Sequence, residues 1–242
     1  GELLRRAEEH RARGERDEEL RALDDLVRAD PAWPGAHLAQ GMALFAAGRY
    51  EEAEASLRAS IRLDPAGHSA RLFLAKARGA QNDERDAESI LSALLEEPLE
   101  PQTELGVRAD LARVFARSTR QAEALAQIDL ALRLAERLGG QVGAAGELTL
   151  VHMQGLILFE MSRLPEAAAC MERVVALRPE RGQDWYNLAS VYSRLERADD
   201  ALNALDRAFT RSPDLRQGAR NDQELAFLRS SRARDFGRLV GR

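Results

Sequence analysis

Small residues recur along this sequence at a nearly fixed interval, and this repeat constrains the fold more than any other feature. Two series of positions, 12 residues apart, step through the chain together by 34, 34, 37, 43 and 34 residues. An interval of roughly 20 to 50 residues is typical of stacked arrays in which each repeat is one supersecondary unit. The first series is Ala7, Gly41, Ala75, Ala112, Gly155 and Ala189, and the second is Glu19, Ala53, Ala87, Ala124, Ala167 and Ala201.

A third, apolar series lies four residues after the second, and residues four apart share one face of a helix. Turn signals such as Ala47-Gly48-Arg49 precede the second series, and prolines at 31, 65, 98, 179 and 213 end most of the second helices. Each unit is therefore predicted to be two antiparallel helices that approach closely where both carry a small side chain. The apolar series is Leu23, Leu57, Leu91, Ile128, Met171 and Leu205.

These units resemble the tetratricopeptide repeat, and the resemblance covers about nine tenths of the chain. Segment 34–67 is a clear copy, although His37 and Gln40 replace the usual large apolar residues at its first two signature positions. Segment 1–33 is a degenerate copy, with Glu19 where alanine is usual. The clearest copy is 182–215, whose signature positions hold Trp185, Leu188, Ala189, Tyr192, Ala201, Leu205, Ala208 and Pro213.

The resemblance implies an all-α fold, a right-handed superhelical solenoid of stacked antiparallel helix pairs. The end of such an array needs a cover for its last exposed face, and the apolar residues Leu225, Phe227, Leu228, Phe236 and Leu239 are expected to supply it. Extra residues near 96–104 and 137–147 are expected to lengthen helices and connections, or to form a loop that reaches over a binding surface. The predicted pairs are 1–33, 34–67, 68–101, 105–138, 148–181 and 182–215, followed by a capping tail, 216–242.

Composition and charge argue against several classes of function. The 35 basic and 40 acidic residues give a net charge of −5, so the basic field that drives nucleic-acid binding is absent. Cys170, the only cysteine, cannot form an internal disulfide or a cysteine zinc site, and the four histidines form no HExxH pair. No apolar stretch approaches the roughly 18 to 20 residues that cross a bilayer. We therefore expect no catalysis, metal, cofactor, nucleic-acid partner or membrane segment.

In the family that the chain resembles, the first helix of each pair lines a concave surface, and the positions not used in packing bind partners. The central positions Lys76, Arg113 and Arg117 are basic, and most of the others are apolar. Such a lining suits an amphipathic or apolar peptide or helix with some acidic character, although the apolar members could instead pack against neighbouring helices. The candidate residues are Leu38, Met42, Phe45, Phe73, Lys76, Arg113, Arg117, His152, Met153, Leu156, Tyr186, Asn187, Ser190 and Arg194.

The sequence thus predicts a non-catalytic protein-interaction scaffold or adaptor, with several alternatives left open. The chain could be the regulatory or substrate-docking domain of a larger enzyme, or a lipid-tethered bacterial assembly factor for an envelope, pilus or secretion system. Self-association is a further hypothesis. A clamp for chaperone tails is disfavoured, because only Asn187 matches the residues of such a clamp. The chain begins with Gly1, so its localisation stays open, with a cytoplasmic protein slightly favoured and a periplasmic one the alternative if an N-terminal leader was removed.

Overall fold

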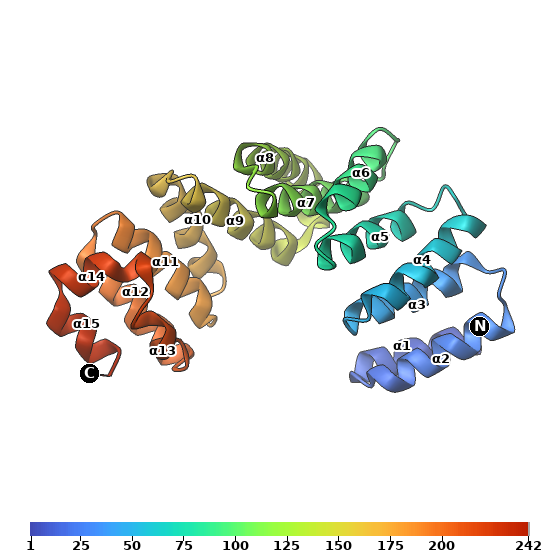
Figure 1. Ribbon diagram of the computed structural model, residues 1–242, viewed down its shortest axis with the longest axis horizontal. Coiled ribbons are helices and arrows are strands. Elements are labelled where there is room, and N and C mark those ends of the chain that lie inside the picture. The colour runs from blue at the N-terminus through green and yellow to red at the C-terminus, as the bar shows by residue number, and fades with distance from the viewer. Residues whose placement is uncertain (242) are drawn as a thin grey trace. The chain divides into compact units, whose positions relative to one another are not determined.

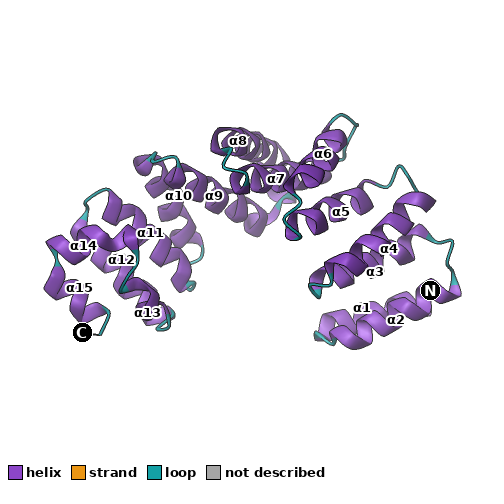
Figure 2. Cartoon of the chain, viewed as in Figure 1, coloured by secondary structure: helices purple, strands orange, loops and turns teal. Residues whose placement is uncertain are grey.

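The computed structural model describes residues 1–241, apart from the side chains of Gln141 and Ala144. Its secondary structure is helical, and the described residues contain no strand (Figure 2). No helix in that part of the chain is both long and apolar enough to cross a membrane. The predicted all-α class is therefore confirmed.

The chain divides into two compact units, Gly1–Arg120 and Gln121–Arg242. In unit 1, consecutive helices pack against each other as hairpins (Figure 1), and each hairpin also contacts the next. The helices of unit 1 are α1 (Glu2–Arg13), α2 (Arg16–Ala29), α3 (Pro34–Ala46), α4 (Tyr50–Leu63), α5 (His68–Ala80), α6 (Glu84–Leu95) and α7 (Pro101–Arg117).

Unit 2 repeats the arrangement and ends in a tail of short helices. Within it, α9 packs between α8 and α10, and α11 packs against both α10 and α12. The helices of unit 2 are α8 (Gln121–Leu138), η1 (Gly139–Gln141), α9 (Gly143–Glu160), α10 (Leu164–Leu177), α11 (Gly182–Arg194), α12 (Ala198–Arg211), α13 (Leu215–Ala219), η2 (Gln223–Leu225), α14 (Ala226–Ser231) and α15 (Ala233–Leu239).

The periodic residues of the sequence form the core of the helix pairs. Ala53, Ala87, Ala124, Ala167 and Ala201 are all 0% exposed, and the apolar series that follows them is buried as well. The first series is buried at the facing positions. A Cβ atom added to Gly41 would lie 2.6 Å from the Leu57 Cγ atom of the paired helix. The small residues therefore mark where the two helices of a pair come closest, as predicted.

The turns inside the pairs share one backbone conformation. A residue one or two positions after the end of each first helix adopts a positive φ, the left-handed conformation that commonly ends a helix. This residue is glycine in the first two turns and asparagine, which adopts the conformation more readily than most side chains, in the third, whereas the last three turns use side chains that rarely adopt it. The six positions are Gly14, Gly48, Asn82, Thr119, Ser162 and Glu196.

The extra residues of the two longer repeats are mostly helical. Helix α7 begins at Pro101, earlier than the predicted 105, because proline suits the first position of a helix. Helices α8 and α9 have 18 residues each, and the short helix η1 lies between them. The predicted start of a repeat at 148 therefore falls inside α9. The alternative of a long loop over a binding surface is wrong for both segments.

The tail supplies apolar residues to the end of unit 2. Leu225 and Leu228 are fully buried, Phe236 is nearly so, and Phe227 and Leu239 are half-buried. Helices α14 and α15 contact α12, while η2 and α14 contact α11. The tail therefore lies against both helices of the last pair.

One position of the second series departs from the small-residue pattern, and we expect a substitution there to stabilise the fold. Glu19 is only 9% exposed, at the position where the other units bury alanine. Among the described residues, none forms an ion pair or hydrogen bond with its carboxylate. We expect Glu19→Ala to raise the free energy of unfolding by about 0.5 to 1 kcal/mol, because alanine fits the helix crossing and favours the helix.

Urea unfolding followed by circular dichroism measures this difference. The matched control is Glu18→Ala on the exposed side of the same helix, which should change stability by less than about 0.5 kcal/mol. A loss of stability in Glu19→Ala would show that the carboxylate has a favourable role in α2.

Candidate functional site

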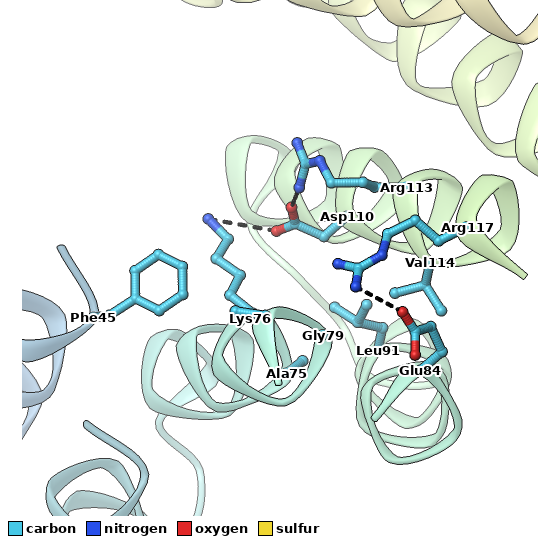
Figure 3. Close-up of a pocket in the computed structure, with 11 residues that line it drawn as sticks. Phe45, Ala75, Lys76, Gly79, Glu84, Leu91, Asp110, Arg113, Val114 and Arg117 are labelled. Carbon is cyan, nitrogen blue, oxygen red and sulfur yellow. Dashed lines mark hydrogen bonds and ion pairs between the residues drawn. The ribbon is translucent and has the colours of Figure 1, made fainter. Parts of the chain in front are cut away.

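A cavity of about 300 Å³ opens on the first helices of unit 1, and it is the candidate binding site. Helix α5 contributes Lys76 and α7 contributes Arg113 and Arg117, while Phe45 of α3 closes one end (Figure 3). Small residues on α5, including Gly79, keep the space between the charged side chains open. The cavity is thus lined by residues from three of the helix pairs predicted from the sequence, and all of these residues lie in unit 1.

The buried carboxylate of Asp110 organises the charges of this cavity. Its side chain is only 8% exposed, the Lys76 Nζ atom lies 3.4 Å from its Oδ2 atom, and the Arg113 guanidinium contacts its Oδ1 atom (Figure 3). The Oδ2 atom has no hydrogen-bond partner among the described residues. Two of the three cations in the cavity therefore share one carboxylate.

The third cation, Arg117, is paired at the opposite wall. Its Nη2 atom lies 2.8 Å from Oε1 of Glu84 and donates a hydrogen bond of 2.6 Å to Oδ1 of Asn82. With three cationic and two carboxylate side chains, the cavity carries one net positive charge. These three cations are those of the predicted basic middle, and each of them is paired with a carboxylate of its own or a neighbouring helix.

Phe45, at the apolar end of the cavity, belongs to an aromatic cluster. The rings of Phe45 and Phe73 meet edge to face with centroids 6.0 Å apart, and Tyr50 lies 5.6 Å from Phe45. The Lys76 ammonium lies 4.8 Å from the centre of the Phe73 ring, where the ring face attracts a cation. Lys76 is therefore held between an aromatic ring and a carboxylate.

Four of the predicted residues of unit 1 come together in this cavity, namely Phe45, Lys76, Arg113 and Arg117. Phe73 lies beneath Lys76 and packs against the core. Leu38 also packs against that core, and Met42 is half-buried on α3. These three residues do not line the cavity, so their share in a binding surface stays a prediction.

Four of the predicted residues of unit 2 line a smaller cavity of about 190 Å³. Leu156, Tyr186, Asn187 and Ser190 line it, although the Ser190 hydroxyl is buried and donates to the Tyr186 carbonyl. Arg194 lies beside it with its guanidinium 4.8 Å from the centre of the Phe159 ring. Met153 is half-buried and does not line the cavity.

Two acidic residues of the tail, Asp222 and Glu224, also reach this cavity. The Tyr186 hydroxyl donates a 2.6 Å hydrogen bond to Asp222, and burial together with this carboxylate raises the pKa of Tyr186. The Arg194 Nε atom lies 3.7 Å from Oε2 of Glu224. Sequence reasoning missed both residues, because they lie outside the repeat and no spacing signal connects them to α11.

His152 belongs to a buried polar network between α9 and α11. Its Nε2 atom lies 3.3 Å from the Asn187 amide and 3.7 Å from Oδ1 of Asp184, a carboxylate that is fully buried and bound by Arg178. Burial lowers the pKa of His152, and this effect outweighs the attraction of the imidazolium to Asp184. The cations Arg178 and Arg181 lower the pKa further.

This pKa shift predicts a pH dependence of stability. Because the folded state takes up the His152 proton less readily than the unfolded state does, the stability of the fold decreases as the pH falls below about 6.5. A His152→Gln variant does not titrate there, so the parent should lose thermal stability relative to this variant between pH 7.5 and 5.5. Melting curves of both proteins measure the difference. A relative gain by the parent would mean that the ion pair with Asp184 dominates.

The described residues offer neither a metal site nor an activated thiol near the two cavities. They contain no group of three or more histidine, cysteine or acidic residues that could hold a metal ion. The Cys170 thiol donates a weak 3.3 Å hydrogen bond to Gln154, and burial raises its pKa, which disfavours the reactive thiolate. The arrangement is suited to binding by side-chain packing and ion pairs.

Comparison with known proteins gives a family match and several fold relatives. A family model described as tetratricopeptide repeat matches residues 4–68 and 152–216, and a second model with the same description matches residues 44–102. No curated protein matches the sequence significantly.

Three solved structures illustrate the likeness in fold. PilW, described as a widely conserved type IV pilus biogenesis factor, shares 13% identity and a TM-score of 0.77, over 93% of this chain and 96% of that chain. PilF of Pseudomonas aeruginosa shares 14% identity and a TM-score of 0.74, over 95% and 96%. YrrB, described as a TPR protein with an unusual peptide-binding site, shares 19% identity and a TM-score of 0.58, over 80% and 93%. At these identities the likeness concerns the fold alone.

Proposed function

Because this chain belongs to the tetratricopeptide repeat family, we propose that it is a non-catalytic scaffold or adaptor whose first helices bind a polypeptide segment of a partner protein. Such repeat arrays use the faces of their stacked helices as extended binding surfaces. The observation that carries the proposal is the cavity of unit 1, in which Phe45, Lys76, Arg113 and Arg117 meet.

The proposed ligand presents an apolar side chain next to a carboxylate. The apolar side chain enters the cavity beside Phe45, and the carboxylate takes Arg113 as its partner. Arg113 is 51% exposed, so its guanidinium is accessible to a ligand carboxylate. Lys76 can remain on Asp110, which keeps the buried carboxylate paired.

A random peptide library displayed on phage tests this proposal, followed by binding measurements on the selected peptides. We expect selected peptides to combine apolar and acidic residues. The double substitution Arg113→Glu, Arg117→Glu should weaken their binding at least tenfold, and so should Gly79→Leu, which fills the cavity without changing its charge. A Cβ atom at Gly79 would meet only the Ala87 methyl at 3.9 Å, so that variant should fold normally.

The matched control is Arg58→Glu, Arg62→Glu, which makes the same charge change at the same spacing on α4 of the same unit. Neither of these arginines lines the cavity. The control should bind the selected peptides as the parent does, and circular dichroism should show equal helicity in all four proteins. Equal binding by the parent and both cavity variants would contradict the proposed site, and selection of basic peptides would contradict the proposed ligand.

A second candidate function is assembly of a type IV pilus, and the similarity to PilF and PilW favours it. Both likenesses extend over nearly the full length of each chain. Deleting the gene in the source organism should then reduce the number of surface pili counted by electron microscopy. Complementation with the Arg113→Glu, Arg117→Glu variant would tell whether the cavity takes part. An unchanged number of pili in the deletion strain would rule out this role.

A further inference from the structure

The tail contains a cavity of its own, separate from the two cavities on the first helices. Its volume is about 200 Å³, and its lining comes from α14, α15 and the residues that directly follow α13 and α15. Figure 1 shows these short helices at the C-terminal end of the chain. No described residue of the repeated helix pairs lines it. The lining consists of Arg220, Arg229, Ala233, Phe236, Gly237 and Val240.

Two arginines of this cavity are held in place by backbone carbonyl groups. Arg220 donates from Nε and Nη2 to the Val240 carbonyl, at 3.2 and 2.9 Å, and Arg229 donates to the Asp222 carbonyl. In the tail as described, neither guanidinium has a carboxylate partner. The Asp222 carboxylate binds Tyr186 instead. Both positive charges are therefore held by backbone carbonyl groups, and the described residues supply no counter-ion to either of them.

The remaining donors of these arginines suit a planar anion. A guanidinium carries five N–H donors in a rigid fork, and one carbonyl group engages only one or two of them. The rest of the cavity is apolar, with Phe236 and Val240 buried in its wall. A cavity of about 150 Å³ with apolar walls can hold a benzene ring, so this one has room for an aromatic or short aliphatic group beside the arginines.

We propose that this cavity binds a monocarboxylate with an apolar body. The carboxylate lies against Arg220 and Arg229, and the apolar body packs against Phe236 and Val240. The acid is either a free organic acid or the C-terminus of another polypeptide. Both present the same chemistry, and the experiment below separates them.

Titration of the full chain with phenylacetate, followed by NMR, tests the proposal. Amide signals of residues 220, 229 and 233–240 should shift on binding. Phenylacetamide lacks the negative charge and inorganic phosphate lacks the apolar body, so each should bind at least tenfold more weakly. The affinity for phenylacetate should also fall with added salt, because the attraction to the arginines is screened. Equal binding of phenylacetamide or phosphate would overturn the proposal.

Gly237→Leu provides a variant that fills the cavity and leaves both arginines unchanged. A Cβ atom at Gly237 would meet no other atom within 4 Å, and the same is true of Gly218, which does not line the cavity. Gly237→Leu should lose at least tenfold in affinity for phenylacetate, whereas the matched control Gly218→Leu should bind as the parent does. Thermal melting shows whether both variants fold. Unchanged binding by a folded Gly237→Leu would also overturn the proposal.

A third arm identifies the source of the carboxylate. A short peptide that ends in phenylalanine is compared as the free acid and as the amide. Free-acid binding at least tenfold tighter than that of phenylacetate assigns the site to a polypeptide C-terminus, and similar affinity assigns it to small organic acids. The amidated peptide should not bind in either case, and its binding as tightly as the free acid would overturn the proposal.

Discussion

Replacing Leu57 by alanine will lower the free energy of unfolding by about 2 to 5 kcal/mol. Leu57 is fully buried where α3 and α4 cross. Its side chain fills the space that Gly41 leaves on the facing helix, so removing it creates a cavity that the backbone cannot close. Urea unfolding followed by circular dichroism measures the loss. A change below about 1 kcal/mol would show that this crossing is loosely packed.

At the same crossing, we expect the effect of Gly41→Ala on the free energy of unfolding to depend on whether Leu57 is present, which a double-mutant cycle measures. In the parent, an alanine Cβ at position 41 would lie 2.6 Å from the Leu57 Cγ atom and 2.8 Å from its Cδ2 atom. We therefore expect Gly41→Ala to destabilise the parent by about 1 to 3 kcal/mol. In the Leu57→Ala protein those atoms are absent, and Gly41→Ala should be neutral or stabilising because alanine favours a helix by roughly 1 kcal/mol over glycine.

Unfolding curves of the four proteins in this cycle measure the coupling between the two positions. An equal cost of Gly41→Ala in both backgrounds would mean that contact with Leu57 is not what excludes a side chain at position 41. The nearest remaining obstacle is the Ala53 carbonyl oxygen, 3.3 Å from the added Cβ atom. That oxygen would then be the cause.

The second large effect is expected at Gly182, the first residue of α11. A Cβ atom there would overlap the Ser212 side chain and would lie 2.8 Å from the carbonyl oxygen of Ala208. We expect Gly182→Ala to cost about 2 to 3 kcal/mol, because a backbone oxygen on the paired helix cannot rotate away. Removing the serine side chain with Ser212→Gly should therefore not restore the lost stability. Thermal melting of the single and double variants measures both effects.

Gly106→Ala is the matched control for this prediction. Gly106 lies in the interior of α7, and its added Cβ atom would be 3.7 Å from Leu72, an ordinary contact distance. Alanine at this position should raise stability by about 0.5 to 1 kcal/mol through helix propensity. Full rescue of Gly182→Ala by Ser212→Gly would show that the serine, and not the carbonyl oxygen, is the obstacle.

Much of the fold follows from local rules that a single sequence expresses. The interval between Gly41, Ala75 and Ala112 marks the close crossings, and the positive-φ turns follow the same interval. The starts of α7 and α9 could not be predicted from that interval, because the extra residues continue a helix instead of forming a loop. A period gives the spacing of equivalent positions, but it does not tell which helix grows when residues are added.

The candidate site was predictable only in part. The faces of α5 and α7 follow from helical periodicity, so Lys76, Arg113 and Arg117 could be assigned to one surface. The pairing of Arg113 with Asp110 follows the i,i+3 spacing within one helix. The pairing of Lys76 with Asp110 and of Arg117 with Glu84 could not be predicted, because these partners lie on neighbouring helices and their distances are set by packing.

The sequence by itself determined the all-α class, the helix crossings, the turns and the family resemblance. These four features depend on residues a few positions apart and on a repeated pattern, so they can be recognised in the sequence without knowledge of the tertiary contacts. The tertiary structure alone decided the net charge of the unit 1 cavity, the entry of Asp222 and Glu224 into the unit 2 cavity, and the cavity between Arg220 and Arg229. Each of these arises where side chains from separate helices meet, and the distances between them are set by packing.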